Sequence, residues 1–414
     1  MSAAEILFVL IIVLIVGDYL LERILDYLNT KHMSAELPDE LQGIYDADSY
    51  RKSQEYQKEK QRFGMLTSTF SFILILVMLF ADGFALLDQL VREITGNQVL
   101  MAVLFFGILG LAADILSTPF SVYHTFVIEE KYGFNKTGPV TFVTDKLKGW
   151  LIGGLIGGGI LALITWIYTL SEEWFWLIAW GAIAVFTIFM SMFYSNIIVP
   201  LFNKQRPLEE GELRDAIEDF ADKVGFKLKD IYVIDGSKRS SKANAYFTGL
   251  GPKKRIVLFD TLIEKHSVEE LTAILAHEIG HYKLKHTREG LILSLLQMGV
   301  MLFVLNLFIS SPALSEALGA ESSSFHMGIL TFGLLYSPIS LLIGLLMNAR
   351  SRKNEYAADR FAGKRYDPDA LMLALKKLST DHLSNLQPHP AYVKFYYSHP
   401  PLLQRLKALR RMNA

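Results

Sequence analysis

The stretch LTAILAHEIGHYKLKHT, residues 271–287, contains two histidines and a glutamate in the pattern H-E-x-x-H. On a helix, His277 and His281 stand one turn apart on a single face, close enough to bind one metal ion. Glu278 is the next residue round, so its carboxylate can reach a water held by that metal. Zinc lowers the pKa of such a water toward about 7, and a carboxylate can then take its proton. The pattern predicts a hydrolytic zinc site; the alternative is an exposed, merely polar helix turn.

A catalytic zinc ion needs a third protein ligand and an open coordination position. The metzincin extension of the motif would place a glycine at Leu284 and a histidine at Thr287, and neither is present. His286 has the wrong helical phase to join the two motif histidines. The third ligand must therefore come from another segment.

The best candidate for the third ligand lies in the stretch NEYAAD, residues 354–359. Glu355 can ligate zinc, and Asp359, one turn further on, can accept the N–H of a ligand histidine and fix its tautomer. The alternative is a solvated acidic helix start, which is the commoner role for a single glutamate. The topology favours a ligand, because a hairpin of two apolar stretches returns the chain to the first helix.

The composition indicates a membrane protein, since 51% of the 414 residues are hydrophobic and only 20% are charged. A bilayer core needs about 20 apolar residues in a helix. Stretches of this kind occur seven times, and none holds a Lys or Arg. We expect membrane spans at residues 6–21, 66–87, 100–118, 150–170, 174–199, 291–310 and 327–349.

The basic residues are distributed unevenly over the loops between these spans. Of the 41 Lys and Arg residues, all but Arg92 fall in alternate loops or after the seventh span. The positive-inside rule places that side in the cytoplasm. We therefore expect the N-terminus outside, the C-terminus inside, and the H-E-x-x-H motif in a long cytoplasmic loop.

The loop that carries the motif has the pattern of a small mixed domain. DIYVID, NAYFTG and RIVLFD, at residues 230–235, 244–249 and 255–260, predict three short strands. Ser267 and Glu270 then form the capping-box pattern S-x-x-E before an apolar-periodic run. The motif histidines therefore lie on a helix that follows the strands.

These elements predict a mostly α fold, in which seven transmembrane helices are combined with a small α+β zinc metalloprotease domain at the cytoplasmic face. We divide the chain into transmembrane helices 1–5 with their loops, the metalloprotease domain with the motif helix, transmembrane helices 6–7, and a C-terminal helical part that carries the third ligand. The boundaries are 1–200, 201–290, 291–349 and 350–414.

Several motifs together carry a family resemblance. HEIGH, the combination of Arg352, Glu355 and Asp359 after an apolar hairpin, and SHPPLLQRL near the end are shared with membrane zinc peptidases, including the shorter heat-shock ones. Three further stretches narrow the resemblance to the type I CAAX prenyl proteases, which cleave prenylated CaaX tails in eukaryotes. They are EEKYGFNKTGPVTFVTDKLKG, VPLFNK and DGSKRSSKANAYFTG, at residues 129–149, 199–204 and 235–249. The resemblance covers nearly the whole chain.

The resemblance implies roles for individual residues and a large water-filled chamber enclosed by the seven helices. Glu355 matches the family's third zinc ligand and Glu278 its general base. Asn244 and His399 match residues that bind the substrate carbonyl and stabilise the oxyanion, although a turn residue and a loop cap are their simpler readings. A tetrahedral intermediate does need such preorganised donors. Arg405 matches a structural arginine near the acidic residues of the site.

The resemblance also implies that NAYFTGL is an edge strand, which would pair with an extended peptide. Lys242, just before it, is a departure, because relatives often carry a histidine there. We take Lys242 to be a peripheral contact. Asp114, deep in the third span, is a separate feature, because a carboxylate in lipid is costly and must face a partner or water. We hypothesise that Asp114 faces the chamber.

We predict a membrane zinc endopeptidase with one Zn²⁺ per chain, acting on peptide or protein substrates that include prenylated tails. One alternative is a quality-control protease that clears misfolded or translocon-jammed membrane proteins; another class is a transporter or channel. The net charge of −1 gives no basic field for nucleic acid, and the absence of cysteine excludes thiolate ligands. We expect a multi-pass protein of the bacterial inner membrane, or of the endoplasmic reticulum membrane in a eukaryote.

Overall fold

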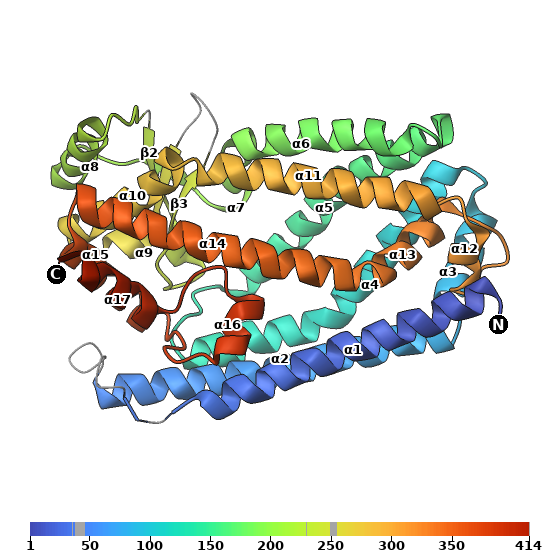
Figure 1. The fold of residues 1–414 in the computed structure, drawn as a ribbon, viewed down its shortest axis with the longest axis horizontal. Coiled ribbons are helices and arrows are strands. Elements are labelled where there is room, and N and C mark those ends of the chain that lie inside the picture. The colour runs from blue at the N-terminus through green and yellow to red at the C-terminus, as the bar shows by residue number, and fades with distance from the viewer. Residues whose placement is uncertain (35, 38–45, 229, 249–254, 414) are drawn as a thin grey trace.

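The structure, a computed structural model, describes residues 1–413 except 35, 38–45, 229 and 249–254. Long helices run side by side along the longest axis of the molecule, as Figure 1 shows. A four-stranded sheet and the shorter helices around it gather at one end, on the left of that view. The N-terminus lies at the opposite end.

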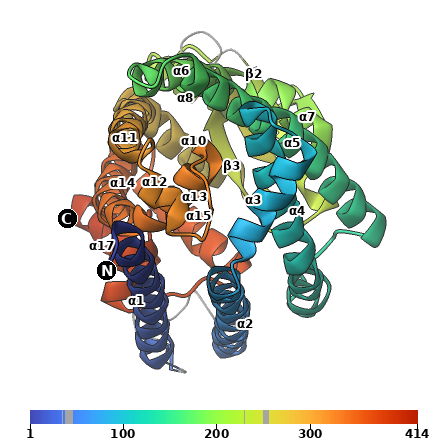
Figure 2. The ribbon, with the colours of Figure 1, turned by 90° about the vertical axis from the view of Figure 1, so that its right-hand side faces the viewer.

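Six helices in the described ranges are long and apolar enough to cross a membrane, and a bent pair adds a seventh span. The pair bends by 54° at Tyr336. Viewed end-on in Figure 2, these helices stand in a ring. The predicted polytopic, mostly α architecture is therefore confirmed. The helices are α1 (Ala3–His32), α2 (Ala47–Phe80), α4 (Gln98–Tyr123), α5 (Pro139–Leu170), α6 (Phe175–Ile197), α11 (His286–Phe308), and the pair α13 (Phe325–Leu335) and α14 (Ser337–Arg365).

The second predicted span was too long at its C-terminal end. The expected stretch, 66–87, runs past the end of α2 at Phe80 into a turn and a separate helix, α3 (Gly83–Ile94). Asp82 adopts the left-handed conformation at φ 52°, which ends the regular helix. Asp tolerates this conformation better than most residues with a side chain. Hydropathy alone does not register such a turn.

The sheet has the order β1-β2-β4-β3 and is mixed. The predicted strands are present as β2 (Asp230–Ile234), β3 (Ala245–Thr248) and β4 (Arg255–Phe259), while Gly249 lies outside the described residues. A fourth strand, β1 (Gln205–Pro207), was not predicted, because three polar or breaking residues carry no strand signal. β2 and β4 are parallel, whereas β3 is antiparallel to β4 and forms an edge of the sheet.

Most of the shorter helices complete the fold around this sheet, whereas α12 lies at the opposite end of the molecule (Figure 1). The motif helix α10 begins with the predicted capping box, in which Ser267 and Glu270 each accept the other's backbone N–H. Its inward face belongs to a core that includes Ile256, Leu258 and Leu275. The remaining elements are α7 (Val199–Phe202), α8 (Glu212–Lys223), α9 (Asp260–Ile263), α10 (Val268–Lys283), α12 (Pro312–Glu316), α15 (Pro368–Asp381), α16 (Pro390–Tyr396), α17 (Leu402–Asn413), the π-helical turn His124–Glu129 and the 3₁₀ turn Gly236–Lys238.

Two of the stretches that carry the family resemblance lie against each other. Arg239 donates from Nε and Nη2 to the two carboxylate oxygens of Asp145, at 2.7 and 2.8 Å. Ser241 donates to the carbonyl of Gly133 at 2.9 Å. These contacts fasten the segment before β3 to the start of α5, so the position of β3 depends on the membrane helices.

Asp114 is paired within the helix ring. Its Oδ2 accepts from Lys146 Nζ at 2.6 Å and from Trp150 Nε1 at 2.8 Å, both on α5. The pairing meets the requirement that a carboxylate within a span has a partner. That Asp114 faces a chamber stays a prediction.

Replacing Lys146 by methionine leaves the Asp114 carboxylate without its cation. We expect a loss of about 1–2 kcal/mol in the free energy of unfolding, because the pair is partly exposed and its worth is reduced by solvent. Asp114→Asn in the same chain should recover most of this loss, since an amide needs no cation. Thermal unfolding in detergent measures both. An unchanged midpoint in Lys146→Met would contradict a stabilising pair.

Candidate active site

The packing of α10 on α14 brings the predicted metal ligands together. Gly280 permits this packing, because a Cβ at that position would lie 3.1 Å from Phe361 Cδ1 on α14. His277 Nε2 lies 3.1 Å from His281 Nε2. The Glu355 carboxylate, brought by α14, places one oxygen 3.4 Å from His277 Nε2 and the other 3.2 Å from His281 Nε2.

These separations fit a single metal ion. Ligands bound tetrahedrally at 2.0–2.2 Å stand about 3.3–3.5 Å from each other, and the three observed edges lie close to that range. The three residues form a group able to hold a metal, with all ligand atoms within 4.8 Å of one another. Glu355 Oε2 is buried and has no hydrogen-bond partner among the described residues. A divalent cation would satisfy that oxygen.

Asp359 and Arg405 fix the orientation of His277. Asp359 Oδ1 lies 2.9 Å from His277 Nδ1, on the side of the ring away from the other ligands. Arg405 donates to both Asp359 oxygens, at 2.8 and 2.6 Å, and its Nη1 lies 3.7 Å from Glu355. Asp359 accepts the Nδ1 proton, which leaves Nε2 with its lone pair for a metal.

The buried charged groups of the site shift one another's pKa. Burial alone would lower the pKa of His277, but the carboxylates of Asp359 and Glu355 raise it to about 9. The Asp359 carboxylate, against the effect of burial, raises the pKa of the Arg405 guanidinium. Since a ligand histidine must be deprotonated, metal binding at His277 displaces a proton.

His286, which its helical phase excluded as a ligand, contacts the second motif histidine, His281. Its Nδ1 lies 3.1 Å from His281 Nδ1. Once His281 Nε2 faces the metal, its ring proton is on Nδ1, so it must donate to His286 Nδ1. His286 therefore keeps its own proton on Nε2 and plays for His281 the part that Asp359 plays for His277.

Two cavities meet at the predicted general base. The lysine cavity, about 640 Å³, is lined by Lys60, Lys242 and Asn244 among others. The histidine cavity, about 370 Å³, is lined by the three ligand residues, His286 and Phe247. Glu278 and His399 line both cavities. An extended chain lying through both would pass Glu278.

The two predicted oxyanion residues are both exposed. Asn244 is exposed, and its Oδ1 accepts from the N–H of Ala245, so its amide N–H groups are directed elsewhere. His399 is 64% exposed, with Nε2 3.2 Å from Glu355 Oε1. Both side chains are therefore accessible to a bound peptide.

Comparisons with known proteins decide the family. A family model described as the CAAX prenyl protease N-terminal region with five membrane helices matches residues 26–204. A second, described as peptidase family M48, matches residues 207–413. The chain belongs to peptidase family M48. It is a membrane-embedded metalloprotease, as predicted.

M48 relatives resemble the chain over nearly its full length. A CAAX prenyl protease 1 homolog of Oryza sativa subsp. japonica is 34% identical, with 94% of each chain covered. A probable CAAX prenyl protease 1 of Schizosaccharomyces pombe is 36% identical, with 94% of this chain and 85% of the relative covered. The crystal structure of S. mikatae Ste24p matches with a TM-score of 0.92 at 32% identity, covering 99% of both chains. The predicted family and fold are confirmed.

Lys242, which we took to be a peripheral contact, has partners that the sequence did not reveal. Its Nζ lies 2.6 Å from Glu129 Oε2 and 3.0 Å from Tyr56 Oη, and it lines the cavity that holds Glu278. Its partners come from α2 and from the π-helical turn, far away in sequence. The nearness of Lys242 to Asn244 in the chain was the one available signal.

We predict that His286→Ala weakens metal binding about 10- to 100-fold, as removal of a partner of a ligand histidine does. His286→Asn should lose less, because the amide oxygen can accept the His281 proton. The rate of zinc transfer to a chromogenic chelator measures this, and the unfolding midpoint of the metal-free protein serves as control. Wild-type transfer rates in His286→Ala would contradict the role.

Proposed function

We propose that the chain is a zinc endopeptidase that hydrolyses peptide bonds in CaaX-type, prenylated C-terminal tails. The observation that carries the proposal is the convergence of His277, His281 and Glu355 in the histidine cavity, next to Glu278 and beside the edge strand β3. The relatives' names supply the substrate class. The four boundaries given above remain our proposed division into domains.

The edge strand and the cavities position the substrate in this proposal. β3 pairs on one side with β4, so its other side can take an extended peptide as a further antiparallel strand. Asn244, at the start of β3, then points its amide toward the scissile carbonyl, with His399 facing it. These two donors stabilise the charge that develops on that oxygen.

Glu278 acts as the general base and then as the acid. Zinc, when bound, supplies a Lewis acid that polarises the carbonyl and lowers the pKa of water toward about 7. Glu278 takes a proton from the attacking water and passes it to the leaving amine. Asp359 and Arg405 hold His277 in the tautomer that the site requires.

We propose that this chemistry takes place at the cytoplasmic face. The support is the charge distribution, which leaves Arg92 as the exception on the other side, together with the position of the sheet and the N-terminus at opposite ends (Figure 1). We further propose a bacterial inner membrane location, with the endoplasmic reticulum membrane as the eukaryotic equivalent.

Glu278→Gln should keep its zinc and lose activity. We expect kcat/KM on a farnesylated CaaX peptide to fall about 10²- to 10⁴-fold or more, because no carboxylate remains to take the proton. Glu269→Gln, at an exposed position of the same helix, is the matched control. Full activity in Glu278→Gln would refute the mechanism.

Equal cleavage of the unprenylated peptide by wild type would favour the quality-control alternative.

Metal analysis tests the ligand set directly. We expect one zinc per purified chain, and its loss in His281→Ala, because two remaining ligands cannot hold the ion in competition with water. His32→Ala, which removes an exposed histidine at the end of α1, should retain the zinc. A zinc content in His281→Ala equal to that of wild type would overturn the assignment.

A further inference from the structure

The lysine cavity contains a cation, Lys60, that no carboxylate of the described residues pairs. Lys242 is neutralised by Glu129, 2.6 Å away, and Arg405 by Asp359. Lys60 lines the same cavity and makes no ion pair or hydrogen bond within the described part of the chain; its Nζ lies 6.0 Å from the centroid of the Tyr56 ring. Glu278, the other charged residue of this cavity without an ion pair among the described residues, lies where the two cavities meet, so the Lys60 ammonium is left to bind an anionic group.

The direction of β3 determines which end of a peptide enters this cavity. Asn244 and Ala245, at the start of the strand, line the lysine cavity, whereas Phe247, near its end, lines the histidine cavity. A peptide added antiparallel to β3 runs the opposite way. Its residues after the scissile bond then lie in the lysine cavity.

The proposed function supplies the group that arrives there. A CaaX tail cut after its cysteine has three residues beyond the scissile bond and ends in an α-carboxylate, about 10 Å away when extended. A cavity of about 640 Å³ is of the size that binds small ligands. Resting on that function, we propose that Lys60 binds the C-terminal carboxylate of the substrate.

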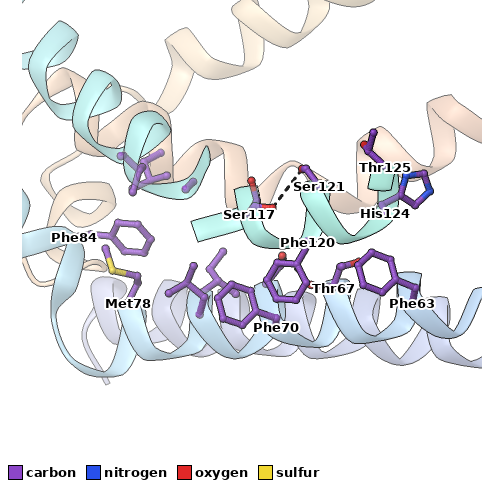
Figure 3. A pocket seen from close by; sticks show the side chains of 16 residues that line it. Phe63, Thr67, Phe70, Met78, Phe84, Ser117, Phe120, Ser121, His124 and Thr125 are labelled. Carbon is purple, nitrogen blue, oxygen red and sulfur yellow. Dashed lines mark hydrogen bonds between the residues drawn. The ribbon is translucent and has the colours of Figure 1, made fainter. Parts of the chain in front are cut away.

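The neighbouring membrane pocket does not offer the same chemistry. Lys60 lies on the face of α2 that continues through Phe63, Thr67 and Phe70, and these line a pocket of about 680 Å³ between α2 and α4 (Figure 3). That pocket is apolar apart from hydroxyl groups and His124, and no Lys or Arg lines it among the described residues. A carboxylate therefore finds its cation at Lys60.

Two farnesylated peptides that differ only at the C-terminus test the proposal. One ends in a free carboxylate and the other in a carboxamide. Wild type should prefer the carboxylate about 10- to 100-fold in kcat/KM, mainly through KM, as a charge-assisted hydrogen bond provides. In Lys60→Met the ratio should fall to about one, and Lys60→Arg should keep most of it.

Lys58→Met is the matched control, because two residues along a helix turn that side chain to the far side of α2. It should leave the ratio as in wild type. Equal cleavage of both peptides by wild type, an unchanged ratio in Lys60→Met, or an equal loss on both peptides would overturn the role of Lys60 while leaving the proposed function intact. Failure of wild type to cleave either peptide would overturn both.

Discussion

The structure depends on one constraint: three predicted ligand atoms from two distant segments must converge on a single point. His277 and His281 come from α10, and Glu355 comes from α14 after the chain has passed through a membrane hairpin. Gly280 allows the two helices to approach closely enough. The membrane hairpin therefore helps to build the active site, because it brings Glu355 to the motif helix. This explains why a hydrolytic motif occurs in an otherwise apolar chain.

Around that point, the buried charged side chains contact and orient one another. Arg405 compensates Asp359, Asp359 orients His277, and His286 orients His281. The net effect is two histidines whose free nitrogens face the same carboxylate. The same segments that build the site also position β3, since Arg239 fastens the chain before it to α5. Metal site, peptide strand and membrane helices are thus mechanically connected.

Local periodicity in the sequence predicted the regular helices and strands. It did not reveal the turns at which a helix ends and a new one begins. Sequence patterns predicted the i, i+4 spacing of His277 and His281, the three longer strands and the membrane spans. Glu355 required the hairpin topology and a family resemblance. His286 was excluded as a ligand on helical phase and does not belong to the group of predicted ligands, but its contact with His281 was not foreseen, because Lys285 adopts a left-handed conformation at φ 64° and a new helix begins at His286. Asp82 ended the second span early in the same way.

If α10 and α14 together build one zinc site, anomalous diffraction at the zinc edge will locate the ion between them. We expect a single strong peak about 2.0–2.2 Å from His277 Nε2, His281 Nε2 and a Glu355 oxygen. A peak coordinated by other residues, or a zinc-loaded crystal in which Glu355 is turned away from the metal, would contradict it.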